Sequence, residues 1–340
     1  MLTEVVFLVV SLGMILFAAE GFTNGVEAFG KRFSLSQAVV GSILAAVGTA
    51  LPETVLPIVA IFLYGGDSAS EIGVGAILGA PFMLSTLAFF LVGLTAAASR
   101  WKKRRCFEIR VEPHTMKRDL LFFVPMYSAA VFIPTVAGKS FSMPVAILLI
   151  AGYLVYAYST FRSESSGLDH AEEMYLQRLL KRMRLAGSPA PHTVAIVAQV
   201  LGALGIMIAG AHSFVKNLGH LSKGLGMDPL LFALILAPIA TELPEKFNSV
   251  TWTWKGRDTL AMGNITGAMV FQATFPVSVG LLFTEWNLTG MALFSAVLAL
   301  ASSLLVLGQL MVTKRLSPVT LLVGGGFYLV YAAVLILNSG

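Results

Sequence analysis

Two proline–glutamate pairs, Pro52-Glu53 and Pro244-Glu245, lie within long apolar stretches of the sequence. A proline inside a helix removes a backbone hydrogen bond and clashes with the carbonyl group four residues earlier, so each helix is expected to kink or break there. Such a break exposes backbone carbonyl groups at the depth of a carboxylate, and hard cations select oxygen ligands of this kind. An ionisable side chain at the centre of a membrane costs about 2.5–3.5 kcal/mol and usually has a functional reason. Glu53 and Glu245 are therefore candidate cation ligands.

Two charged residues beside the second Pro-Glu pair have no charged counterparts beside the first pair. Glu242 and Lys246 stand where the first pair has Ala50 and Thr54. Because Glu242 comes four residues before Lys246, the spacing and order favour an ion pair on one helix. We hypothesise a site with three carboxylates and one ammonium, which titrates as a unit. In the alternative, Lys246 extends toward the cytoplasmic edge of the membrane instead.

Four other polar side chains occupy matching positions in the two regions. Thr49 and Thr241 each lie four residues before a candidate glutamate, on the same helical face, and can add hydroxyl or carbonyl oxygens. Glu20 and His212 lie near the ends of two further apolar segments. They are candidates for a proton relay or for groups that admit cations from outside, since histidine titrates near neutrality. An ordinary polar contact explains them equally well.

The composition places these residues in a membrane protein. The chain is 56% hydrophobic and only 12% charged, with a mean hydropathy of +0.82, which excludes a typical soluble domain. About 20 apolar residues cross a bilayer, and ten such runs are present. We predict an all-α polytopic membrane protein with spans near residues 3–25, 36–64, 72–98, 119–137, 143–161, 193–216, 228–253, 259–283, 288–311 and 318–337.

The chain also contains an internal repeat. The segment AVGTALPE (46–53) aligns with PIATELPE (238–245) at an offset of 192 residues. We predict a first repeat of five helices at 1–161, a cytoplasmic linker at 162–192 and a second repeat of five helices at 193–340. Five is an odd number, so the second repeat enters the membrane with opposite polarity. Inverted repeats of this kind are typical of transporters that work by alternating access.

Basic residues are distributed unevenly between the predicted loops. If the helices alternate, 19 of the 23 lysines and arginines lie on one side, which is the cytoplasmic side by the positive-inside rule. Both termini are then outside the cytoplasm and the central linker is cytoplasmic. The short length of 340 residues suggests a prokaryotic cytoplasmic membrane. The basic segment 101–105 is interpreted as part of this topology signal and not as a nucleic-acid site. Cys106 is the only cysteine, so a thiolate metal cluster is excluded, and we expect no resident cofactor.

The paired motifs resemble those of the sodium/calcium exchanger membrane region, in the calcium:cation antiporter superfamily. The two repeats of that family each hold a G-T-S-x-P-E/D motif and, one helix later, a G-N-x-x-G-S-N-x-x-N/D motif. This chain has GTALPE and ATELPE in the first pair of positions, and GAILGAPFML and GNITGAMVFQ in the second. The resemblance implies a ten-helix exchanger that holds its ions between the second, third, seventh and eighth helices. It also implies that the first and sixth helices move.

Residue by residue, the family's ligand positions fall on Thr49, Glu53, Thr241 and Glu245. The family's Asn or Asp ligands of the third and eighth helices are replaced by Leu84 and Gln272, and Gln272 remains a candidate ligand. The motif serines are replaced by Ala50, Glu242, Ala80 and Ala268. Much of the oxygen that coordinates sodium in the family is thus missing, which favours proton coupling.

The sequence therefore predicts a secondary antiporter that exchanges Ca²⁺, or a related cation, for Na⁺ or H⁺. The partners expected are inorganic cations and the lipid bilayer; protein partners cannot be read from the sequence. The first alternative is a Na⁺ or K⁺/H⁺ antiporter on the same fold, and a passive channel fits less well. An enzyme is not expected: a metal-dependent hydrolase within the membrane lacks an HExxH motif here. A scaffold would not need two buried Pro-Glu elements.

Overall fold

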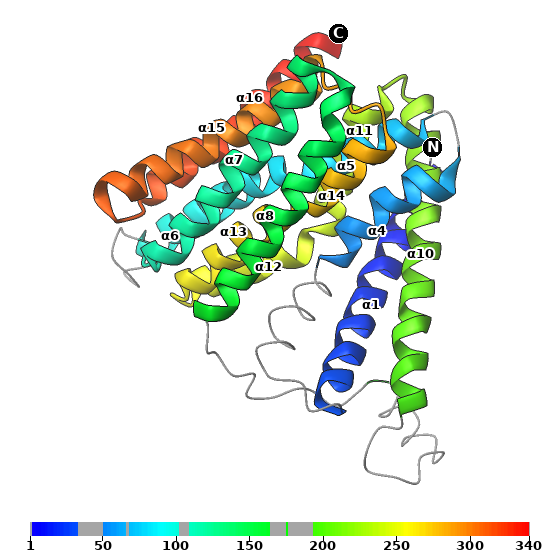
Figure 1. The fold of residues 1–340 in the computed structure, drawn as a ribbon, viewed down its shortest axis with the longest axis horizontal. Helices are drawn as coiled ribbons and strands as arrows, with labels where there is room; N and C mark the ends of the chain where they lie inside the picture. The colour runs from blue at the N-terminus through cyan, green and yellow to red at the C-terminus, as the bar shows by residue number, and fades with distance from the viewer. Residues whose placement is uncertain are drawn as a thin grey trace. The chain divides into compact units, whose positions relative to one another are not determined.

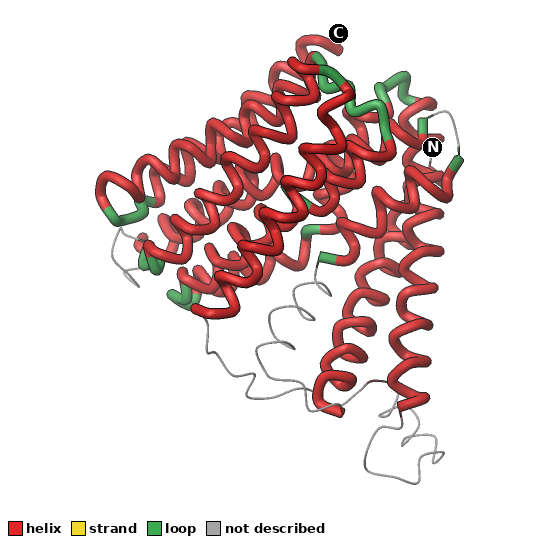
Figure 2. Tube along the Cα trace, viewed as in Figure 1, coloured by secondary structure: helices red, strands yellow, loops and turns green. Residues whose placement is uncertain are grey.

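The protein is almost entirely helical in the computed structural model, which describes residues 2–32, 50–65, 68–101, 109–163, 175 and 193–339 (Figure 1). The described helices follow one another through short loops, and a single isolated bridge between Ile109 and Leu316 is the one piece of strand-like pairing in the described residues (Figure 2). Among the described residues, eight helices are long and apolar enough to cross a membrane, and two shorter apolar helices cover Leu51–Tyr64 and Pro229–Thr241. These ten elements lie at the ten predicted spans.

In sequence order, the helices correspond to five predicted spans before the linker and five after it. The elements before the linker are α1 (Leu2–Arg32), α4 (Leu51–Val59) with the π-helix η2 (Ala60–Tyr64), α5 (Ala69–Met83) with the π-helix η3 (Leu84–Ala88) and α6 (Phe89–Trp101), α7 (Pro113–Ala137), and α8 (Ser142–Ser163) after the short η4 (Lys139–Phe141). Those after it are α10 (Thr193–Gly224), α11 (Pro229–Thr241) and α12 (Leu243–Trp254), α13 (Asp258–Gln272) and α14 (Phe275–Phe283), α15 (Gly290–Thr313), and α16 (Pro318–Ser339). Within 164–192 the structure describes Tyr175 alone, and this residue is helical.

Two compact units cut across the predicted repeats. One comprises Met1–Gly65 and Ala157–Leu225, and the other comprises Gly66–Tyr156 and Gly226–Gly340. Each unit thus takes segments from before and after the linker. The division of the chain at 161 and 193 stays a prediction, because compactness does not report where a repeat begins.

The first unit is built around α1 and α10, which lie side by side along most of their lengths (Figure 1). The Ser11 hydroxyl donates to the Ser213 hydroxyl at 2.8 Å, and the Gln199 side-chain amide donates to the Gly21 carbonyl at 2.8 Å. The residue numbers rise along one helix as they fall along the other, so the pair is antiparallel. Helix α4 with η2 packs against α10 in the same unit.

The second unit has its closest helix contact between α5 and α11. A Cβ atom on Gly75 would collide with the Leu230 carbonyl, and one on Gly79 would collide with the Leu234 carbonyl and the Pro238 ring. Only glycine permits backbones to approach this closely, as in other membrane helix pairs. Gly75 and Gly79 therefore allow the third span to pack closely against α11. This contact holds α11, whose C-terminal end carries the candidate site.

Three of the predicted basic loops meet within the second unit. Ile109 pairs with Leu316, the Arg110 amide donates to Asp258 Oδ2 at 3.0 Å, and the Thr259 hydroxyl donates to the Arg110 carbonyl at 3.3 Å. These contacts join the segments before α7, α13 and α16. The three loops therefore lie on one side of the unit, as the alternation of the predicted spans requires.

Candidate cation-binding site

The seventh span breaks at Glu242. Helix α11 ends at Thr241, Glu242 has φ −92° and ψ 9°, and α12 begins at Leu243. Pro244 lies in the first turn of α12, where a proline is tolerated because the first amide groups of a helix have no partner inside it. The predicted break is confirmed. It brings the carbonyl end of α11 next to the amide end of α12.

Lys246 and Glu242 form a buried ion pair at this break. Lys246 Nζ lies 2.9 Å from Glu242 Oε2, and the two side chains are 6% and 2% exposed. The same ammonium donates a hydrogen bond of 3.2 Å to the Pro238 carbonyl in the last turn of α11. The carbonyl end of a helix attracts positive charge. The ion pair expected from the spacing is present, and the alternative in which Lys246 extends to the membrane edge is wrong.

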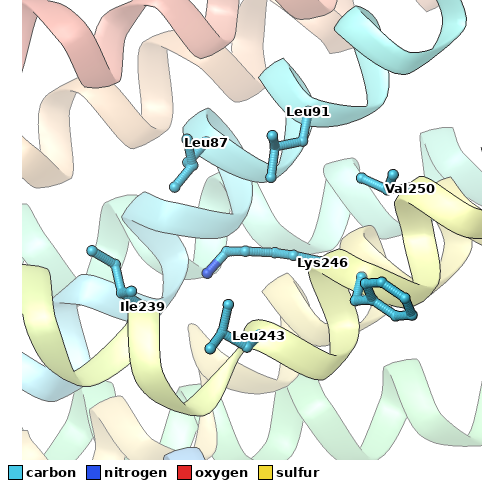
Figure 3. A pocket seen from close by; sticks show the side chains of 7 residues that line it. Leu87, Leu91, Ile239, Leu243, Lys246 and Val250 are labelled. Carbon is cyan, nitrogen blue, oxygen red and sulfur yellow. The ribbon is translucent and has the colours of Figure 1, made fainter.

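A crevice of about 280 Å³ opens beside the ion pair (Figure 3). Its walls come from η3, α6, α11 and α12 and are formed by Leu87, Leu91, Ile239, Leu243, Lys246, Phe247 and Val250. In Figure 3 the Lys246 side chain runs between Leu87 and Leu243. Its methylene groups therefore pack along apolar walls while its ammonium reaches the break, a common arrangement for long basic side chains.

Two carboxylate oxygens at the second break have no hydrogen-bond partner among the described residues. They are Glu242 Oε1 and Glu245 Oε2, and both are buried. Leaving a buried acceptor unsatisfied costs about 1–3 kcal/mol, and more for a charged group, so a proton or a bound cation would relieve this cost. Glu245 lies in the first turn of α12, and the Thr241 hydroxyl donates to the Ala237 carbonyl at 3.1 Å, which leaves its oxygen able to accept or coordinate.

The first Pro-Glu element repeats the backbone geometry of the second. Ala50 has φ −87° and ψ 2°, within a few degrees of the values at Glu242. The Thr54 amide donates to the Ala50 carbonyl at 3.2 Å, and the Lys246 amide donates to the Glu242 carbonyl at 3.1 Å. The repeat seen in the sequence is therefore also a repeat of local conformation, with the same turn before the same proline.

The side chains of the first element are simpler. Glu53 is 7% exposed and lies in the first turn of α4, as Glu245 does in α12. The Thr54 hydroxyl donates to the Ala50 carbonyl at 2.8 Å, so a neutral group fills the position that Lys246 has in the second repeat. Thr49 lies outside the described residues.

The third and eighth spans are irregular at the positions that the resemblance singles out. The π-helix η3 begins at Leu84, and α13 ends at Gln272, after which Ala273 and Thr274 separate it from α14. Gln272 is 2% exposed. The sequence reasoning treated 259–283 as one helix and missed this interruption, although Pro276 in the first turn of α14 is a signal for it. Among the described residues of either compact unit, no three histidine, cysteine, aspartate or glutamate side chains converge on a metal-sized site.

Comparison with known proteins assigns the family. The sodium/calcium exchanger protein family matches residues 3–162 and 195–340, which leaves out residues 1–2 and 163–194. This chain belongs to that family. The exchanger is therefore a membrane transporter and not an enzyme, and the hydrolase alternative is set aside.

Individual relatives agree with the family assignment. The putative antiporter CaxA of Alkalimonas amylolytica is 26% identical over 98% of this exchanger and 100% of its own length. Among solved structures, the H⁺/Ca²⁺ exchanger CAX has a TM-score of 0.73 at 18% identity and covers 98% of this chain and 82% of its own. The sodium-calcium exchanger NCX_Mj has a TM-score of 0.57 at 18% identity, with 98% of both chains covered. The structural similarity shows the fold, which is the two-repeat exchanger fold predicted from the sequence.

Glu20 and His212 lie at different positions along the axis of the antiparallel α1–α10 pair. Glu20 accepts a hydrogen bond of 2.7 Å from the Tyr175 hydroxyl, and His212 packs edge-on against the Tyr64 ring with centroids 6.4 Å apart. His212 is next to Ser213, whose partner is Ser11, more than two turns of α1 from Glu20. The two residues are therefore not brought together, and their part in transport stays a prediction.

A buried acid that the sequence reasoning did not single out anchors α13. Asp119 on α7 is 1% exposed and accepts hydrogen bonds from the Thr266 hydroxyl at 2.7 Å, the Tyr156 hydroxyl at 3.1 Å and the Arg118 guanidinium at 3.2 Å. Thr266 is on α13, six residues before Gln272. Asp119 therefore fixes the helix that ends at Gln272. The available signal was a lone carboxylate at the start of an apolar run.

Proposed function

We propose that this exchanger moves Ca²⁺ in exchange for Na⁺ or H⁺, and that Glu53 and Glu245 bind the transported cation. The observation that carries the proposal is the second break, where buried carboxylate oxygens without hydrogen-bond partners lie beside the carbonyl end of a helix. The names of the relatives support the choice of cation, since they include an H⁺/Ca²⁺ exchanger and a sodium-calcium exchanger.

The proposed ligands are the oxygen types that Ca²⁺ selects. Glu53 and Glu245 supply carboxylates from equivalent first turns of α4 and α12. Thr49, Thr241 and Gln272 would add neutral oxygens. Glu242 contributes charge to the same break, although one of its oxygens is bound to Lys246. No resident cofactor is needed, because the bound groups are the transported cations themselves.

Alternating access follows from the inverted repeats. Exchanging the conformations of two similar halves converts an outward-open transporter into an inward-open one. We propose that α1 and α10 are the moving helices. Their membership of one compact unit supports this, because two helices that pack along most of their lengths can move as a body.

The proposed orientation places both termini outside and the central linker in the cytoplasm of a prokaryotic cell, in its cytoplasmic membrane. The support is the excess of basic residues in the loops that alternate to one side, together with the contacts that join three of these loops.

A second candidate function is Na⁺ or K⁺/H⁺ exchange on the same fold. One observation favours it: the ion pair with Lys246 occupies an oxygen of Glu242 that a divalent cation would otherwise use. Leu84 also offers no oxygen where the family has a ligand. A site with fewer free carboxylate oxygens discriminates less strongly in favour of Ca²⁺.

The deciding experiment is cation exchange in proteoliposomes. Calcium, magnesium, manganese, sodium and potassium would be tested in turn against imposed sodium and proton gradients. We expect calcium uptake driven by one of these gradients and its loss in Glu53→Gln and Glu245→Gln. Glu285→Gln is the matched control, because Glu285 is exposed and outside the site. Proton-coupled sodium or potassium flux without calcium movement would instead establish the second candidate, and no gradient-driven flux would refute both.

A further inference from the structure

The Lys246 ammonium is bound as a transported cation would be bound. Its partners are a carboxylate oxygen of Glu242 at 2.9 Å and the Pro238 carbonyl at 3.2 Å. A carboxylate and a carbonyl at the end of a helix are the oxygen ligands used for alkali and alkaline-earth cations at broken membrane helices. The protein therefore supplies one of its own side chains to a place that suits a monovalent cation.

On the side of the crevice, the Lys246 ammonium faces no other polar side chain among the described residues. The other side chains that line the crevice beside it are all aliphatic or aromatic, namely Leu87, Leu91, Ile239, Leu243, Phe247 and Val250. Moving the ammonium into this crevice would separate two buried charges and leave each of them uncompensated. Lys246 is thus held at Glu242 by its environment as well as by the ion pair.

The first repeat shows what the same element is like without a tethered charge. Its backbone turn at Ala50 matches that at Glu242, and Thr54 stands at the position of Lys246. The ion pair is therefore not required to build the turn. Its presence in the second repeat alone needs another explanation, and the charge that it adds to the site provides one.

We propose that Lys246 is a tethered cation that permanently fills one monovalent cation position of the exchanger, so that each transport cycle carries one coupling cation fewer. This inference rests on the proposed function. In the site of the proposed function, Glu53, Glu242 and Glu245 would carry three negative charges and Lys246 would return one positive charge, which leaves two for the transported ions. One Ca²⁺ then balances two monovalent cations, and exchange is electroneutral.

The test compares charge variants in proteoliposomes at fixed membrane potential. The steady-state calcium accumulation ratio would be measured with a constant sodium or proton gradient and a potential set by potassium and valinomycin. The wild-type ratio should not depend on the potential. Lys246→Met exposes a third negative charge, so three monovalent cations leave for each Ca²⁺ that enters, and an inside-negative potential of about 59 mV should lower the ratio tenfold.

Removing Glu242, the partner of Lys246, should make the accumulation ratio depend on the potential in the opposite direction. Glu242→Gln leaves one net negative charge, so the same potential should raise the ratio about tenfold. The double variant Glu242→Gln/Lys246→Met has the charge of the wild type and should lose its dependence on potential, and Lys246→Arg should keep the wild-type coupling. Opposite shifts that cancel in the double variant are not expected from a purely structural ion pair.

A binding measurement covers variants that fold but do not transport. Thermal unfolding in detergent would be followed in sodium chloride and in N-methylglucamine chloride at equal ionic strength. Lys246→Met should gain a sodium-dependent stabilisation beyond that of the wild type, because a ligand that binds only the folded state stabilises it, and the double variant should lose this gain.

The outcomes separate the two proposals. Wild-type exchange with an unchanged coupling ratio in Lys246→Met and Glu242→Gln would overturn the tethered cation while leaving the proposed function intact. Equal sodium stabilisation in wild type and Lys246→Met would also overturn it. Absence of gradient-driven calcium flux in the wild type counts against the proposed function, and the sodium measurement then still decides whether Lys246 replaces a cation.

Discussion

The two Pro-Glu elements share a backbone and differ in charge. In each element a helix begins directly after a turn residue, Ala50 or Glu242, and these two residues have nearly the same dihedral angles. Both helices have a glutamate in their first turn. The second element adds the Glu242–Lys246 ion pair, whereas the first has Ala50 and Thr54. The same turn thus precedes Leu-Pro-Glu in both elements, although the residues beside it differ in charge.

A second comparison concerns the glycines of the third and eighth spans. Gly79 packs against the backbone of α11, whereas a Cβ atom on its counterpart Gly267 would meet only the Tyr156 hydroxyl, at 3.6 Å. Gly263, the counterpart of Gly75, has nothing within 4 Å of a Cβ atom among the described residues. Glycine therefore allows a close helix approach at Gly75 and Gly79, and the described residues show no such approach at the matching Gly263 and Gly267.

The largest effect is expected when the first element is given a positive charge. In Thr54→Lys the new ammonium has no carboxylate four residues earlier and lies beside the proposed ligand Glu53. We expect calcium transport to fall roughly 100-fold or more, as when a close charge pair is disrupted by 2–5 kcal/mol. Flux in proteoliposomes is the measurement, and Thr54→Val is the control for loss of the hydroxyl. Adding Ala50→Glu should recover part of the loss; full activity of Thr54→Lys would contradict the role of Glu53.

The next effect concerns the stability of the second element. Glu242→Ala leaves Lys246 buried without its carboxylate and should lower the free energy of unfolding by about 3–5 kcal/mol. The double variant Glu242→Ala/Lys246→Thr, which copies the side chains of the first element, should cost much less. Unfolding in mixed detergent micelles measures both. If the losses of the single variants simply add in the double variant, the two side chains do not interact as the 2.9 Å distance implies.

A smaller effect is expected from the matched glycines. Gly79→Ala forces a methyl group against the Leu234 carbonyl and should cost about 1–3 kcal/mol of stability, with loss of transport because α11 carries Thr241 at its end. Gly267→Ala should be close to neutral, or slightly stabilising because alanine favours helix formation. Thermal unfolding and flux of the two variants should be compared side by side. Equal costs would show that the two spans are packed alike.

The smallest effect is expected from an exposed ion pair that has the same chemistry as the buried one. Lys139 and Glu285 lie 2.7 Å apart, but their side chains are 59% and 83% exposed. Surface pairs contribute about 0–1 kcal/mol because water and salt screen them. Lys139→Met should therefore change unfolding and calcium coupling little, in contrast to Lys246→Met. A change in coupling for Lys139→Met would mean that any lost lysine has this effect, whatever its position.

Much of the fold could be predicted because it depends on local chemistry. Hydropathy located ten spans, and a proline within an apolar run was enough to place the break at Glu242. The same reasoning singled out Glu53 and Glu245 as candidate ligands, since a carboxylate is rare in such a run, and this role stays a prediction. These features are properties of a few consecutive residues in a membrane, and no partner segment is needed to specify them.

Other features depended on which helix faces which. The direction of Lys246, the interruption after Gln272, the three hydrogen-bond donors to Asp119 and the unequal roles of Gly79 and Gly267 were undetermined or missed. The four-residue spacing permitted both a paired and a snorkelling lysine. Only the packing of α6, α11 and α12 around the crevice excluded the second, because the burial of a charge depends on neighbours from distant parts of the chain.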